Sequence, residues 1–446
     1  MPAVSHPPGP KPRFLIGNFP LASLDPLKTF TSWAREFGDI FYYRAGWIHV
    51  YFLNHPDLIE SVLVNHADNF LKDRVIQNSR WFLGDGLLTS EGASWRRQRR
   101  FCQPAFHRQR LQSYAETITS TAHEFLSSWK DGETRDLHQE MMQLTLHIVA
   151  KVLFSVEVQS ETAGVAQALN LLMKHTSGAR MVLPPAVRHL PLPFLIRVRQ
   201  AVRRLDDVVY NIIRQRRAKG DVQQYGDLLS MLMGAVDEDG SRMSDRQLRD
   251  EIMTFLLAGH ETTALSLSWT WYLLSQNRSV EATLEQELRK VLGGRMPNFS
   301  DLPQLCYAEA VIKESMRLYP PAWSLARTAA KDCEIASYRI PAGANVVMSQ
   351  WIMHRSPRFY EDPERFNPER WFTEATQRLP RFTYFPFGGG SRRCIGASFA
   401  MMEAMLLLAA IAEKFRFELV PGHPIIPVPS ITLRPKYGMK MTLCQM

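Results

Sequence analysis

Apolar residues recur at helical spacing along most of the chain. Beyond position 55 this period predicts helices at residues 56–66, 94–130, 136–155, 163–175, 195–219, 278–292 and 304–318. Residues 47–53 (WIHVYFL) are instead rich in aromatic and β-branched side chains, which is typical of a strand, and short strands recur around 335–350. The pattern predicts a mainly α fold with a minor β region.

The longest predicted helix covers residues 244–276. Ser244 and Gln247 have the spacing of a capping box at its start. At ~1.5 Å per residue this helix is roughly 48 Å long, so its apolar middle must cross the core. That middle reads AGHETT (258–263), which is an unusual choice for a purely structural helix.

Two segments lack periodicity. Prolines at 184, 185, 191 and 193 predict a loop, or short amphipathic pieces, over 180–194 between two helices. Residues 355–393 are dense in Pro, Gly and Arg, and so long an irregular stretch is usually functional. An apolar helix is expected to open at Cys394 and to run to about Phe415.

Neither repeats nor long linkers divide the 446 residues, so we expect a Pro-rich segment over 1–20 and one large domain over 21–446. The first 20 residues lack the apolar stretch of a signal or membrane anchor, and the apolar run 404–412, bounded by Glu403 and Glu413, is too short to span a bilayer. Five widely spaced cysteines form neither a disulfide framework nor a zinc pattern, which favours a reducing cytoplasm.

The formal charge of +9 is concentrated in two arginine-rich segments, 96–100 and 197–217. They are either solvated helix faces or a docking surface for an acidic protein partner. No helix-turn-helix, zinc-finger or RNA-binding motif is present, so a nucleic-acid partner is not expected.

The segment FGGGSRRCIG (387–396) carries the strongest chemical signal. Three glycines allow tight turns and close approach to a flat group. A cysteine where a loop becomes a helix has its thiolate stabilised by backbone N–H groups and the helix dipole. The alternative is a buried structural cysteine, but packing does not require these glycines and Arg392. A lone cysteine suits a metal whose other ligands come from a cofactor, and heme iron is the leading case.

This segment resembles the heme-binding signature FxxGxRxCxG of the cytochrome P-450 superfamily, with Phe387, Gly390, Arg392, Cys394 and Gly396 at its fixed positions. The resemblance extends over nearly the whole chain. It implies a single, roughly triangular, mainly α domain that binds heme b through Cys394. It also implies that heme lies between the 244–276 helix and the helix after the cysteine.

Residues 258–263 resemble the oxygen-activating segment of that family. Gly259 would leave room for O2 and substrate, Thr262 would hydrogen-bond iron-bound dioxygen, and Glu261 would feed protons inward. A threonine in mid-helix can also merely bond back to its own helix. We interpret His260 as an ordinary helix residue. Ala258 stands where one branch carries a heme-linking carboxylate, so covalent attachment is not expected.

Glu314 and Arg317 resemble the family's ExxR pair, which an arginine from a PERF motif completes. Both Arg365 and Arg370 are candidates, and spacing to Cys394 favours Arg370. The resemblance further implies that the heme propionates are bound by Trp95, Arg99, Arg327 and Arg392.

The family resemblance predicts a soluble, bacterial-type monooxygenase that hydroxylates a small apolar substrate with O2. No flavin reductase follows Cys394 in this chain, so a ferredoxin- or flavodoxin-type donor with its own reductase is expected, and the protein is expected to be a monomer. Candidate substrate contacts are Phe82, Leu87, Met181, Leu183, Ala258 and Trp323.

Three alternatives stay open. A peroxygenase that uses H2O2 would lack the Glu261–Thr262 pair, and a non-catalytic heme sensor or carrier would not need it. A membrane-anchored microsomal member does not fit the N-terminal sequence as given, unless that end is truncated.

Overall fold

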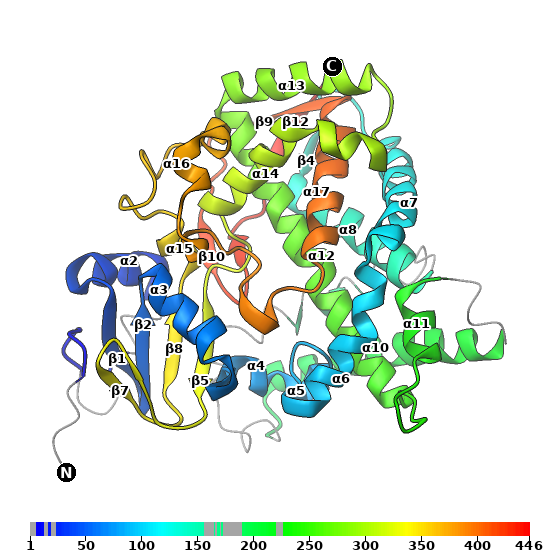
Figure 1. Ribbon diagram of the computed structural model, residues 1–446. Coiled ribbons are helices and arrows are strands. Elements are labelled where there is room, and N and C mark those ends of the chain that lie inside the picture. Colours follow the sequence, from blue (N-terminus) through cyan, green and yellow to red (C-terminus); the bar gives the residue numbers. More distant parts are fainter. Residues whose placement is uncertain are drawn as a thin grey trace, which may run out of the picture. The chain divides into compact units, whose positions relative to one another are not determined.

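The computed structural model describes residues 6–12, 17–18, 24–155, 165, 167–169, 171–172, 190–219 and 226–446 (Figure 1). They belong to two compact units, each assembled from segments distant in sequence. The first contains residues 1–77, 313–394 and 429–433, and the second contains 78–312, 395–428 and 434–446. The predicted helix 163–175 and loop 180–194 fall mostly outside the described residues, as do Met181 and Leu183.

The first unit is built on a mixed five-stranded sheet with strand order β1-β2-β8-β5-β3. Its strands are β1 (Ile40–Ala45), β2 (Ile48–Leu53), β3 (Phe70–Lys72), β5 (Leu325–Ala329) and β8 (Asn345–Met348). The predicted strand at 47–53 is confirmed as β2, which pairs antiparallel with β1 and parallel with β8. Helix α2 (Pro26–Phe37) packs on β1, where Phe30 and Trp33 contact Tyr43.

Short elements make up the rest of this unit. They are α3 (Pro56–Glu60), η1 (Ser61–Asn65), η2 (Ala67–Asn69), β6 (Cys333–Ile335), β7 (Tyr338–Ile340), α15 (Gln350–Met353), η8 (Pro368–Phe372), α16 (Glu374–Gln377), η9 (Arg381–Thr383) and η10 (Gly390–Arg392). The predicted helix 56–66 is therefore α3 followed by a π-helical turn. The segment 355–393 is irregular as predicted, with only brief turns.

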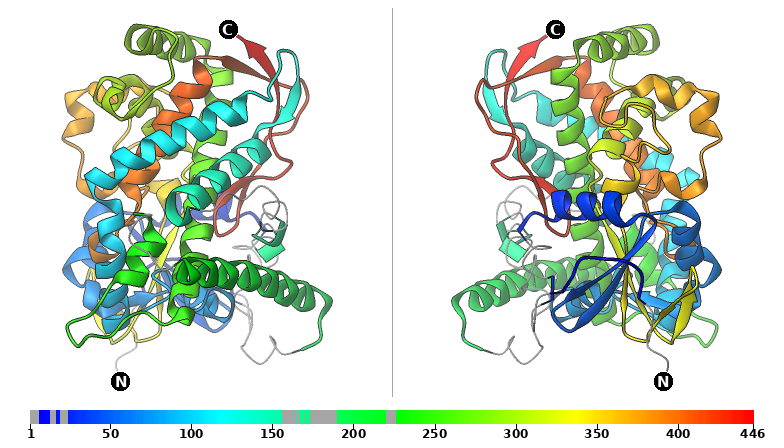
Figure 2. Two further views of the ribbon diagram at one scale, coloured as in Figure 1. Left: turned by 90° about the vertical axis from the view of Figure 1, so that its right-hand side faces the viewer. Right: turned by 90° about the vertical axis from the view of Figure 1, so that its left-hand side faces the viewer.

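The second unit is helical, and α12 (Asp245–Gln276) runs through it beside α8 and α17 (Figures 1 and 2). Its other elements are α5 (Arg80–Leu83), α6 (Gly92–Cys102), η3 (Gln103–Phe106), α7 (Arg108–Leu126), β4 (Thr134–Asp136), α8 (Leu137–Phe154), α10 (Pro193–Ala218), α11 (Leu228–Gly234), α13 (Arg278–Leu292), η7 (Phe299–Gln304), α17 (Ala397–Ala412), β9 (Phe415–Leu419) and β12 (Lys440–Gln445). Helices α4 (Arg74–Asn78) and α14 (Cys306–Leu318) and strands β10 (Pro427–Pro429) and β11 (Leu433–Pro435) contain residues of both units.

Two sequence-based boundaries are wrong. The continuous helix predicted over 94–130 is broken by the 3-10 turn η3, because Pro104 cannot donate a backbone hydrogen bond inside a helix. Helix α17 begins at Ala397 with Gly396 as its N-cap, so Cys394 precedes the helix instead of opening it. The capping box of Ser244 and Gln247 is present as predicted. Within the described residues, no helix combines the length and apolar character needed to cross a membrane.

Candidate functional site

The middle of α12 has an accessible strip in an otherwise buried helix. Residues 248–257 and 263–271 are buried, whereas Ala258 is exposed and Gly259 and Thr262 are half-buried. Ala258 and Thr262 are four residues apart and therefore lie one above the other on the same face. The Thr262 hydroxyl donates to the Ala258 carbonyl at 2.8 Å. The Ala258 methyl group and the Thr262 hydroxyl therefore lie next to each other on the accessible strip.

Gly259 lies against helix α8. A Cβ atom at this position would lie 3.1 Å from Cγ2 of Val149 on α8. The glycine therefore allows α8 and α12 to pack closely. On the accessible strip, Ala258 exposes only a methyl group. His260 is buried, with its Nδ1 at 2.5 Å from the Leu256 carbonyl of the same helix.

Glu261 is buried and forms an ion pair with Arg434, whose Nε donates to Glu261 Oε1 at 2.6 Å. Burial, followed by the positive charge of Arg434, lowers the pKa of the neighbouring His138 to about 4. His138 is therefore neutral at pH 7, and Arg434 supplies the positive charge near Glu261. No local sequence pattern pointed to Arg434, which is 173 residues away along the chain.

In the first unit, the glycines before Cys394 are required by the backbone. Gly388 and Gly390 have φ values of 67° and 65°, in the left-handed region. A Cβ on Gly390 would lie 1.8 Å from the carbonyl oxygen of Leu63, so this loop is pressed directly against η1. The Cys394 N–H donates to the Phe387 carbonyl at 3.0 Å, and the cysteine itself is exposed.

The carboxylate of Glu314 holds the irregular segment together. Arg317 pairs with both of its oxygens, at 2.8 and 2.9 Å, and Arg370 Nε donates to Oε1 at 2.9 Å. Trp371 Nε1 donates to Oε2 at 3.0 Å, which a phenylalanine could not do. Arg365, the other candidate, is exposed, and its backbone carbonyl accepts hydrogen bonds from Arg317 and Arg370. Of the two candidate arginines, it is Arg370 that pairs with the Glu314 carboxylate.

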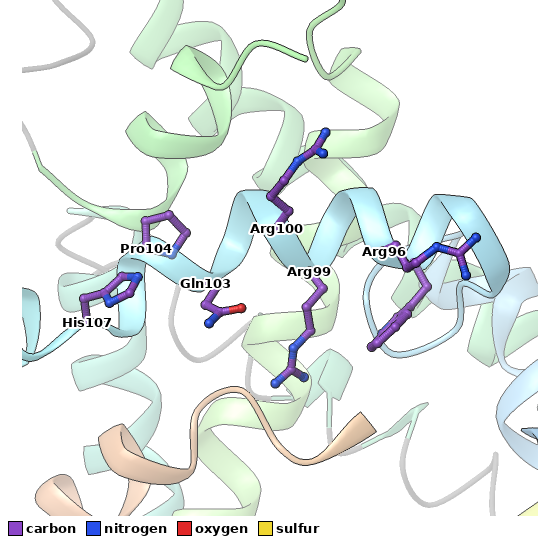
Figure 3. A pocket seen from close by; sticks show the side chains of 7 residues that line it. Arg96, Arg99, Arg100, Gln103, Pro104 and His107 are labelled. Atoms are coloured by element: carbon purple, nitrogen blue, oxygen red, sulfur yellow. The ribbon is translucent and has the colours of Figure 1, made fainter. Parts of the chain in front are cut away.

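A pocket lies along α6 (Figure 3). Its lining residues are Trp95, Arg96, Arg99, Arg100, Gln103, Pro104 and His107. Arg99 and Arg100 extend from opposite sides of the helix. Arg97 and Arg100 both pair with Asp237, so part of the arginine cluster is neutralised within the protein.

The remaining predicted residues have varied surroundings. Arg327 is buried on β5 near Asp73, and Arg392 is half-buried in η10. Trp323 Nε1 donates to the Ser430 carbonyl at 2.8 Å, and its ring stacks with Phe30. Phe82 and Leu87 are buried in the second unit.

Glu403 is a buried acidic residue, whereas the sequence pattern predicts it only as the boundary of an apolar run. It lies inside α17, fully buried, and burial raises the pKa of its carboxyl to about 8 despite a hydrogen bond with Thr263. A single acidic residue within an otherwise apolar helix was the available signal.

Known proteins resemble this chain along almost its full length. The Cytochrome P450 family model matches residues 7–442. Cyclooctatin synthase of Streptomyces melanosporofaciens is 38% identical, covering 94% of this chain and 91% of that protein. Cyclooctat-9-en-7-ol 5-monooxygenase of the same organism is 36% identical, covering 86% and 84%. The structure of retinoic acid bound cyanobacterial CYP120A1 aligns over both whole chains with a TM-score of 0.88 at 24% identity.

The last likeness shows the fold, and the family model and the relatives show the family. The chain belongs to the cytochrome P450 family and is an oxidoreductase whose cofactor is heme b.

Proposed function

We propose that this protein hydroxylates a largely hydrocarbon, terpene-like substrate. The overall change is substrate C–H plus O2, two electrons and two protons giving substrate C–OH and water. The accessible strip of Ala258 and Thr262 within buried α12 carries the proposal, because it sets an apolar methyl beside one hydroxyl. The name of the relative cyclooctat-9-en-7-ol 5-monooxygenase supports a cyclic, mainly hydrocarbon substrate.

The residues present fit heme b. The exposed thiol of Cys394 follows a loop in which Gly388 and Gly390 adopt left-handed φ values, and α12 exposes the small side chain of Ala258. We assign Cys394 as the iron ligand. We assign Trp95, Arg99, Arg327 and Arg392 to the heme propionates. In the loop around the cysteine, we assign Phe387, Gly390 and Gly396 to heme binding. When bound, the heme-thiolate supplies the iron centre that activates O2.

The chain's own contribution is proton delivery at the accessible strip. Thr262 Oγ1 is on that strip and can exchange its bond to the Ala258 carbonyl for one to a ligand. Glu261 lies one residue earlier, inside the protein, where Arg434 holds its carboxylate. Release of Glu261 from Arg434 would let the carboxyl carry a proton toward Thr262 Oγ1, as general acid catalysis requires.

Electrons come from a separate protein in this proposal. Three arginines line the pocket along α6, and among them Arg96 is exposed and available to a partner protein. An acidic ferredoxin or flavodoxin is complementary to that charge.

The test is a screen of cyclic terpene hydrocarbons and alcohols for the spin-state change that follows displacement of water from iron. Compounds that bind are then incubated with 18O2 and a surrogate ferredoxin system. We expect a product that carries one 18O atom per molecule. If terpenes of the panel bind but none of them causes NADPH-dependent O2 consumption or gives a product, the result would instead favour a heme carrier or sensor.

A further inference from the structure

Three consecutive charged residues are buried at the start of α12, where a helix would normally present charges to water. Arg249, Asp250 and Glu251 are 7%, 5% and 0% exposed. Removing charges from water costs several kcal/mol per ion unless each charge finds a well-placed partner. Their partners therefore indicate what this cluster does.

Each of the three side chains binds one backbone group: Arg249 bonds to helix α5, and Asp250 and Glu251 bond to the loop between α5 and α6. Arg249 Nη2 donates to the Phe82 carbonyl at 3.0 Å. Asp250 Oδ2 accepts from the Asp85 N–H at 2.8 Å, and Glu251 Oε2 accepts from the Leu87 N–H at 3.0 Å. Charge-assisted bonds to backbone amides are strong and directional.

Two glycines of the loop make this approach possible. A Cβ on Gly84 would lie 1.9 Å from Oδ1 of Asp250, and a Cβ on Gly86 would lie 2.4 Å from both the Asp250 carbonyl and Oγ1 of Thr254. The loop thus alternates glycines that contact the helix with residues whose N–H groups bind its carboxylates.

Further bonds fix the loop from its other side. Gln98 Nε2 donates to the Asp85 carbonyl at 2.6 Å, and Arg80 pairs with the Asp85 carboxylate at 2.7 Å. Arg249 also pairs with Asp206 of α10, at 2.6 Å. All of these bonds, from Arg249, Asp250 and Glu251 to the 84–87 loop and its surroundings, lie within the second unit.

Of the three buried charged residues, Glu251 shares the face of α12 that carries the accessible strip. Glu251 precedes Ala258 by seven residues, which is close to two full turns, or roughly 10 Å along the axis. Leu87, whose N–H binds Glu251, therefore lies at the N-terminal end of the strip that presents Ala258 and Thr262.

We propose that Asp250 and Glu251 are specificity-determining positioning residues, whose carboxylates set the position of loop 84–87 and thereby the space available to a substrate beside Ala258. They need not touch the substrate. The inference rests on the proposed function only in placing the substrate at this strip.

Azole ligands of increasing size test it without turnover. Imidazole, 1-phenylimidazole and clotrimazole bind heme iron through nitrogen, and spectral titration of the purified holoprotein gives their dissociation constants. In Glu251→Ala the ratio of the clotrimazole and imidazole constants should change by about tenfold, because the loss of a charged hydrogen bond frees Leu87. Glu251→Gln keeps an acceptor oxygen and should retain the wild-type ratio.

Asp245→Ala removes another carboxylate from the first turn of α12 that pairs with Arg217 instead of the loop, and is the matched control. If Glu251→Ala does not fold, Glu251→Asp replaces it, since it keeps the charge but withdraws it by one methylene. Hydrogen-exchange measurements should show that the Leu87 amide exchanges faster in Glu251→Ala than in the wild type. Equal changes for all three azoles, or a Gln variant that behaves like the Ala variant, would overturn the proposal. Because azoles need no turnover, failure to find a hydroxylated product leaves this test intact.

Discussion

Thr262 shows how one side chain can satisfy both helix and chemistry. Its hydroxyl bonds back to the Ala258 carbonyl, as mid-helix threonines commonly do, yet it stays on the accessible strip. Thr263, the next residue, is buried beside Glu403 instead. The two adjacent threonines therefore have separate surroundings.

Thr262→Ala should uncouple O2 consumption from product formation. The variant should still consume O2 and NADPH but release most of the reducing equivalents as H2O2, with product per O2 falling on the order of tenfold or more. Thr262→Ser keeps the hydroxyl and should recover most of the coupling. Measuring H2O2, product and O2 together checks this. Equal coupling in wild type and Thr262→Ala would remove the hydroxyl from the mechanism.

The two arginines of the PERF-like motifs can be told apart by stability. Arg370→Met leaves part of the buried Glu314 charge uncompensated, so the free energy of unfolding should fall on the order of 3 kcal/mol. Arg365→Met is the matched control, because only the backbone of this residue takes part. Chemical denaturation of both variants makes the comparison. A larger loss in Arg365→Met would contradict the pairing.

Among the helices, α17 contains an acidic group that is unusual for its surroundings. Its sequence from Ala397 to Ala412 is apolar apart from Ser398 and Glu403, and the Glu403 carboxyl is fully buried. Burial raises the pKa of this carboxyl from 4.5 to about 8. The group is therefore mainly protonated in the folded protein at pH 7 and ionised in the unfolded chain.

This difference gives a pH dependence of known sign. Between pH 4.5 and about 8, unfolding releases the Glu403 proton, so rising pH favours unfolding by up to about 1.4 kcal/mol per pH unit. The Glu403 contribution is fully present below pH 4.5 and is lost by pH 8. Glu403→Gln should lack this slope and gain stability relative to wild type as pH rises. Parallel stability curves for both proteins from pH 5 to 8 would contradict the shift.

Element prediction succeeded where local signals were strong. The capping box and long apolar pattern predicted α12, and the aromatic, β-branched run predicted β2. The helix over 94–130 was predicted as continuous although Pro104 was a local signal for the break. The start of α17 was placed three residues early because Cys394 was assumed to lie on the helix.

Across the whole chain, the sequence indicated which residues carry chemistry but not their tertiary partners. The FxxGxRxCxG and AGHETT segments are contiguous, so their chemistry could be read directly. The partner of Glu261, Arg434, and the loop bound by Glu251 are 173 and 164 residues away along the chain. Such pairings depend on how distant segments pack, and a single sequence carries no local record of them.

The assignment of Cys394 as the iron ligand is tested by the difference spectrum of the reduced, CO-bound protein, compared between Cys394→Ser and Cys102→Ser. Cys102 is fully buried in α6 and serves as the matched cysteine control. The wild type and Cys102→Ser should show the red-shifted band of a thiolate-bound heme–CO complex, and Cys394→Ser should lack it. Persistence of that band in Cys394→Ser, or its absence from the heme-containing wild type, would contradict the assignment of Cys394 as the iron ligand.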